Sequence, residues 1–180
     1  MLNLTRKDWR FCLRWTVATA IALSLCGLLG PVGFMVGPLT LAIAQGVALK
    51  GYWGRAIFWG FGMVVGGHTA WVALALGLLA QAPVSLAIVM SSAVLGLAQA
   101  FVLRGASQVW RWWPLVTIVI LQVSIGWFVP LVLNAAVYGS QRPMWQWITL
   151  TTLTGLIGGS LTSIALAWVL KQPPRFSQIR

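Results

Sequence analysis

Six long apolar segments follow one another along the chain, separated by short polar or turn-forming stretches. They cover residues 11–29, 32–49, 56–80, 83–103, 113–133 and 147–170, about the lengths expected of membrane spans. Apolar residues are continuous in each segment and do not alternate with polar ones, as membrane β-strands would require. The pattern therefore predicts one all-α integral membrane domain over residues 1–180, with six transmembrane helices.

Composition strengthens this prediction. Hydrophobic residues make up 59% of the chain and charged residues 7%, whereas soluble domains carry about 25% charged residues. A net charge of +11 would favour nucleic-acid binding in a soluble protein. Here the cations lie in short clusters between apolar segments, so we expect contacts with anionic lipid headgroups and no nucleic-acid partner.

The distribution of cations predicts the orientation. Six spans would place Arg142 alone on one side of the membrane. The other side receives Arg6, Lys7, Arg10, Arg14, Lys50, Arg55, Arg104, Arg111, Lys171, Arg175 and Arg180. Cytoplasmic loops of membrane proteins are enriched in Lys and Arg, so both termini are expected in the cytoplasm. A cleaved signal peptide is the alternative for the first segment, but the segment is long and no A-x-A-like site follows it.

Part of the sequence repeats. The segments AQGVALK (44–50) and AQAFVLR (98–104) match, with Gln45 and Gln99 54 residues apart. A weaker copy, AWVLK (167–171), has Leu166 at the glutamine position. We predict three parallel helical hairpin repeats, each ending in Leu-Lys or Leu-Arg. The alternative is that this ending recurs only because every inward end carries a cation.

Several of these segments carry a resemblance. GLAQAFVLR (96–104), Trp112-Trp113 and Gly126-Trp127 resemble a group of uncharacterised small polytopic bacterial membrane proteins, many from photosynthetic species. The resemblance covers roughly half of the chain. It implies a multi-pass protein of the bacterial plasma membrane or an internal photosynthetic membrane. It implies no activity, and no functional residue carries over.

Small residues line several predicted helix faces. GxxxG spacing allows two helix backbones to approach closely, either within the chain or between copies in a homo-oligomer. The candidate packing residues are Gly33 with Gly37, Gly62 with Gly66, and Gly155 with Gly159.

A few polar residues lie within the spans, where polar groups are usually partnered or functional. The binding candidates are His68, Gln45, Gln99, Gln122, Thr154 and Ser163. His68 is the only histidine and lies beside Gly66-Gly67, so it is a candidate axial ligand for a tetrapyrrole metal. The alternative is a hydrogen bond to a neighbouring helix. No cofactor or metal is predicted, although a tetrapyrrole or a carotenoid stays open.

The sequence predicts a protein that is not an enzyme. Asp8, the only acidic residue, lies outside the predicted spans, which excludes carboxylate acid/base pairs and carboxylate proton relays within them. We expect an accessory or scaffold component of a larger membrane assembly. The alternative is binding or transport of a vitamin, lipid or pigment, by a protein similar to the six-span substrate-binding subunits of vitamin uptake systems.

Overall fold

The computed structural model describes residues 4–29, 31–125 and 143–172, and these residues are helical with no strand. The helices are α1 (Arg6–Leu28), α2 (Pro31–Leu49), α3 (Ala56–Leu79), α4 (Val84–Leu103), the short 3-10 helix η1 (Trp110–Trp112), α5 (Trp113–Ile125) and α7 (Met144–Leu170). The observed bounds follow the predicted segments closely. The predicted continuation of the fifth segment, residues 126–133, lies outside the described residues.

Local sequence signals explain where helices begin and turn. Thr5 and Asp8 form a reciprocal capping box that satisfies backbone N–H groups at the start of α1. Gly51 has a φ of 81° in the turn between α2 and α3, a conformation that glycine adopts without steric cost. Pro83 and Pro143 directly precede α4 and α7, positions where a missing N–H is tolerated.

Within the described residues, four helices are long and apolar enough to cross a membrane: α1, α3, α4 and α7. The described part of α2 contributes a shorter apolar helix, Met35–Leu49, and α5 is described over 13 residues. Large apolar side chains are exposed along the outer faces, including Leu13, Ile21 and Val65. Apolar helices with apolar outer faces are typical of a protein embedded in lipid.

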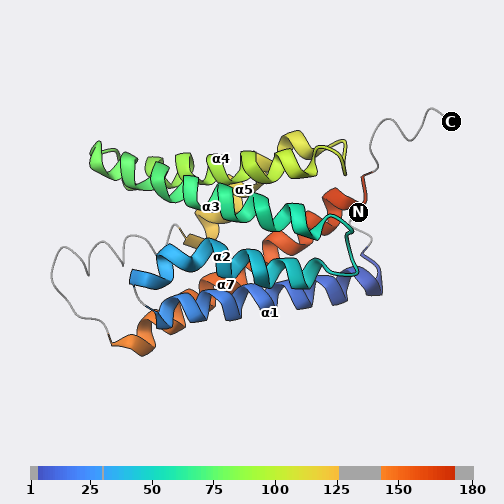
Figure 1. The fold of residues 1–180 in the computed structure, drawn as a ribbon, viewed down its shortest axis with the longest axis horizontal. Helices are drawn as coiled ribbons and strands as arrows, with labels where there is room; N and C mark the ends of the chain where they lie inside the picture. The colour runs from blue at the N-terminus through green and yellow to red at the C-terminus, as the bar shows by residue number, and fades with distance from the viewer. Residues whose placement is uncertain (1–3, 30, 126–142, 173–180) are drawn as a thin grey trace.

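The helices form a closed ring in chain order. From α1 to α5, each helix packs against the one before it and the one after it. The last helix, α7, packs against α5 and extensively against α1, which closes the ring. The closure brings α1 and α7, the first and last described helices, side by side (Figure 1).

Glycines permit the closest approaches in this ring. A Cβ on Gly155 would lie 2.7 Å from the Ala20 Cα, and one on Gly66 would lie 2.6 Å from the Ala98 Cβ. Gly159 similarly faces α1, and Gly62 faces α4. Gly33 and Gly37 lie against Cys26 at the α1–α2 corner. These glycines therefore allow neighbouring helices of the same chain to pack closely against each other.

The two halves of the bundle along the helix axes differ in how densely their side chains pack. The main cluster of buried apolar residues comes from the same end of every helix: the starts of α1, α3 and α5 and the ends of α2, α4 and α7. Its members are Phe11, Cys12, Trp15, Ala42, Ala48, Leu49, Trp59, Met63, Ala100, Leu103, Trp113, Leu166, Ala167 and Val169. This tightly packed half lies next to the basic loops.

Asp8 ties three elements together at this end. Asp8 is 4% exposed, and its carboxylate forms an ion pair with Lys171 after α7 and accepts a 2.7 Å hydrogen bond from the Tyr52 hydroxyl. Burial, and then the hydrogen bond to Asp8, raise the pKa of Tyr52, so its phenol stays protonated and donates. The one acidic residue of the chain thus connects α1, the α2–α3 turn and the end of α7.

Replacing Asp8 by Asn should destabilise the closed ring, because the Lys171 ion pair is lost at a buried position. We expect a loss of about 2 kcal/mol, or roughly 4–8 °C in Tm, in detergent. Circular dichroism during heating measures this shift. Lys50→Gln, which removes an exposed charge from the same end, is the matched control and should leave Tm nearly unchanged. Equal effects of the two substitutions would contradict the assignment.

Candidate functional site

A cavity of about 530 Å³ occupies the other half of the ring, and all six described α-helices line it. Its wall is largely apolar, with side chains such as Leu23, Leu41, Leu74, Ile88 and Leu95. The cavity is within the size range of small-molecule sites, which are about 300–1,000 Å³ and mostly apolar.

Hydroxyl groups supply part of the polar lining. Those of Ser92, Ser124, Thr154 and Thr162 donate to carbonyl oxygens of their own helices, at 2.6–2.9 Å. Their protons are therefore already used, and their oxygens present lone pairs. These hydroxyls can accept hydrogen bonds from a bound molecule but offer it few donors.

Gln45 forms one polar bridge at the floor of the cavity. Its Oε1 accepts a 3.1 Å hydrogen bond from the Trp59 indole on α3, and its Nε2 donates to the Thr19 hydroxyl on α1 at 3.3 Å. The amide thus connects α2 to both neighbouring helices. Both Gln45 and Trp59 are buried.

Gln99 forms an equivalent bridge on α4. Its Oε1 accepts a 2.8 Å hydrogen bond from the Trp113 indole on α5, and its Nε2 lies 2.8 Å from the Met63 sulfur on α3. Trp113 follows Gln99 by 14 residues, the same interval as between Gln45 and Trp59. Sequence reasoning selected both glutamines but missed their tryptophan partners, which this shared interval would have indicated.

Three buried tryptophans form an aromatic layer between the cavity and the basic end. Trp15 and Trp59 lie edge to face with ring centroids 5.5 Å apart, and Trp59 and Trp113 do so at 5.9 Å. All three are at most 1% exposed. The Trp15 Nε1 is the one buried side-chain polar atom among the described residues without a hydrogen-bond partner.

Thr154 lines the cavity with the two glutamines, whereas the other predicted binding residues lie elsewhere. Ser163 is fully buried outside the cavity lining and donates to the Ser160 carbonyl. Gln122 is half-buried and reaches the Ser85 carbonyl at 3.3 Å. The structure therefore brings three of the predicted residues to one site.

His68 lies on the exposed face of α3, away from the cavity. Its Nδ1 lies 2.7 Å from the Val64 carbonyl, which can only accept, so Nδ1 donates. The neighbouring Gly66 and Gly67 face Ala98 and Pro38 inside the bundle. Ligation of a tetrapyrrole metal by His68 stays a prediction. Across the described ranges, no three His, Cys, Asp or Glu side chains form a potential metal site.

Comparison with known proteins adds no identification. No family model, no curated protein and no solved structure matches this chain.

Replacing Gln45 or Gln99 by Leu should destabilise the bundle, because each change leaves a buried indole N–H without an acceptor. We expect losses of about 1–2 kcal/mol for each variant, measured by unfolding in detergent with SDS. Gln122→Leu is the matched control, since Gln122 is less buried and partners no indole. Losses no larger than that of the control would contradict the proposed structural role of the glutamine–tryptophan pairs.

Proposed function

We propose that this chain is a non-enzymatic membrane protein that binds a small, predominantly apolar molecule in its central cavity. The cavity carries the proposal: all six described α-helices line it, its wall is largely apolar, and its hydroxyls are already hydrogen-bonded. A ligand of this site would have a large apolar surface and a few hydrogen-bond donors that match the hydroxyl oxygens. Lipids, apolar vitamins and pigments fit this description. Transport of such a ligand would be an extension of the same function.

The accessory or scaffold role expected from the sequence receives less support. It rested on the absence of catalytic groups and partly on Gly-rich helix faces, and in the described residues these glycines contact neighbouring helices of the same chain. Assembly into a homo-oligomer or a larger complex would have to use other surfaces.

Removing cavity volume should abolish ligand binding. Ser91 lines the cavity, so Ser91→Phe places a ring inside it. In organic extracts of purified protein analysed by mass spectrometry, we expect a compound that co-purifies with the parent and falls at least tenfold in this variant. Thr69→Phe, at an exposed position on α3, is the matched control and should retain the compound. Equal retention by both variants, or a parent protein without a bound compound, would count against the proposal.

We also propose six membrane spans with both termini in the cytoplasm. The support is that the start of α1 and the last residues of α2, α4 and α7 lie together at one end of the bundle. Contacts of Asp8 with Tyr52 and Lys171, and of Arg55 with Gly105, indicate this. Lys and Arg gather at this end, as expected of a cytoplasmic face.

Reporter fusions test this topology. Fusions after Arg55, Arg104 and Arg180 should report the cytoplasm, and fusions after Gly30, Gln81 and Ser140 should report the opposite side. A paired alkaline phosphatase and green fluorescent protein reporter distinguishes the two compartments. Any position that reports the wrong side would break the six-span arrangement.

We further propose that three helical hairpins repeat around the cavity. Its support is a contact that recurs around the ring. The residue that follows each tryptophan of the aromatic layer lies against a small residue of the helix that comes before it in the ring. Gly159 faces Thr16, a Cβ on Gly60 would lie 3.8 Å from the Ala42 carbonyl oxygen, and Gly96 faces Pro114.

This correspondence changes the alignment of the third repeat. Gln45 and Gln99 each lie three residues after the small residue of their helix, and on α7 that position is Thr162. The contacts therefore favour Thr162, not Leu166, as the counterpart of the two glutamines. A threonine is too short to bridge as glutamine does, and its hydroxyl already bonds to Gly158. This accounts for the unpartnered Trp15 indole.

Thr162→Gln should then supply the missing acceptor. We expect this variant to be at least as stable as the parent, with a gain of up to about 1 kcal/mol, because a buried indole N–H becomes satisfied. Unfolding in detergent measures stability, and the indole N–H exchange rate of Trp15 measures the new bond. Thr154→Gln, which lies two turns away on the same helix, is the control and should destabilise. Similar losses in both variants would contradict the repeat.

A further inference from the structure

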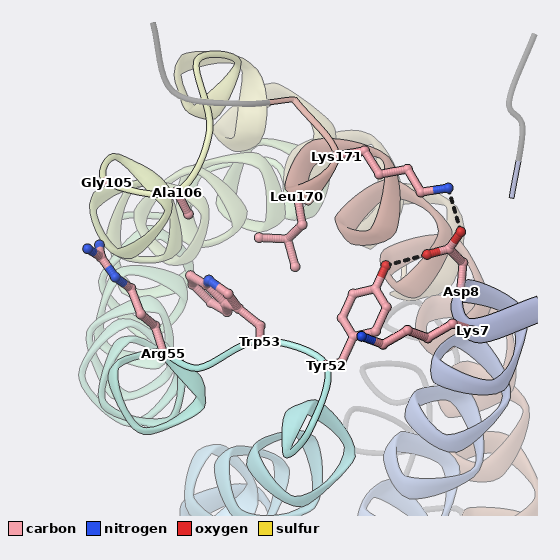
Figure 2. Close-up of a pocket in the computed structure, with 9 residues that line it drawn as sticks. All are labelled: Lys7, Asp8, Tyr52, Trp53, Arg55, Gly105, Ala106, Leu170 and Lys171. Carbon is pink, nitrogen blue, oxygen red and sulfur yellow. Dashed lines mark hydrogen bonds and ion pairs between the residues drawn. The ribbon is translucent and has the colours of Figure 1, made fainter. Parts of the chain in front are cut away.

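A second pocket, of about 390 Å³, lies at the basic end of the bundle, on the far side of the tryptophan layer. Residues from the start of α1, the α2–α3 turn, the loop after α4 and the end of α7 line it (Figure 2). It is separate from the central cavity and shares no lining residue with it.

The charges of this pocket are unbalanced. Lys7, Arg55 and Lys171 contribute three cations, and Asp8 contributes the one carboxylate. Asp8 is already occupied by Lys171, by the Tyr52 hydroxyl and by the Thr5 hydroxyl and backbone N–H. Lys7 and Arg55 therefore have no further carboxylate side chain to pair with, since Asp8 is the only acidic residue in the sequence.

The cations lie on opposite sides of an apolar floor. Figure 2 shows the Trp53 and Leu170 side chains between Arg55 on one side and Tyr52, Lys7 and Lys171 on the other. The Arg55 guanidinium lies against the backbone of Gly105, where a larger residue would collide with it. Lys7 lies over the Tyr52 ring, 5.7 Å from its centroid.

We propose that this pocket binds a phosphate group carried by an amphipathic molecule, namely the headgroup of an anionic phospholipid. Lys and Arg donate charge-assisted hydrogen bonds to phosphate oxygens. Trp53 and Leu170 offer an apolar surface to the glycerol and upper acyl carbons, and tryptophan is enriched at this depth of the membrane. A soluble phosphate compound would share the same cations but would leave the apolar floor uncovered. The proposal is independent of ligand binding in the central cavity.

Native mass spectrometry of the full chain in mild detergent tests the proposal. The probes are dioleoyl phosphatidylglycerol, dioleoyl phosphatidylcholine and inorganic phosphate. Lys7→Gln/Arg55→Gln removes two exposed pocket cations, and Lys50→Gln/Arg10→Gln removes two exposed cations outside the pocket lining. Parent and control should bind phosphatidylglycerol in preference to phosphatidylcholine. The pocket variant should bind phosphatidylglycerol about 25-fold more weakly, about fivefold for each cation lost.

The outcomes separate the possible sources of the phosphate. Unchanged phosphatidylglycerol binding in excess inorganic phosphate supports the lipid headgroup. Displacement by millimolar phosphate overturns it in favour of a soluble phosphate ligand. Equal weakening in the pocket and control variants overturns the site itself, because the attraction would then be general surface charge. Unchanged Tm of both double variants without lipid establishes that each is folded.

Discussion

Lipid provides no hydrogen-bond partners, and this constraint explains where the polar side chains of the chain lie. Gln45 and Gln99 point into the ring, and each joins three helices through its amide. Most hydroxyls bond to carbonyls of their own helices. Large apolar side chains cover the outer surface. The distribution is the reverse of that in a soluble domain, and the interior is where selective binding can occur.

The tryptophan layer separates two environments along the bundle. On its basic side, large side chains fill the interior and one carboxylate connects the ends of three elements. On its other side, a largely apolar wall with several hydroxyl groups surrounds a cavity of about 530 Å³. Because the packed half already holds the helices together, the hollow half need not be filled for the ring to form. A densely packed base beside a cavity is a favourable arrangement for binding, since the site is pre-formed.

The proposed repeats also carry an informative asymmetry. In two hairpins a glutamine accepts a hydrogen bond from the indole N–H of a tryptophan in the aromatic layer. In the third, Thr162 occupies the equivalent position and the Trp15 N–H has no partner. An unpaired buried donor costs free energy that the fold recovers elsewhere. The same two helices, α1 and α7, pack extensively against each other, and glycines bring their backbones close together.

The sequence by itself determined the helical content, the bounds of most helices and their apolar character, because helix length and continuous apolarity are local properties. It also selected Gln45, Gln99 and Thr154, because amides and hydroxyls within apolar helices are conspicuous. Only the tertiary structure decided which of the predicted residues meet. His68 faces outward although it lies at the centre of a span, because helix rotation is set by packing against α2 and α4. Two partners of Asp8, Tyr52 and Lys171, lie 44 and 163 residues away in the sequence, and closure of the ring is what brings them to it.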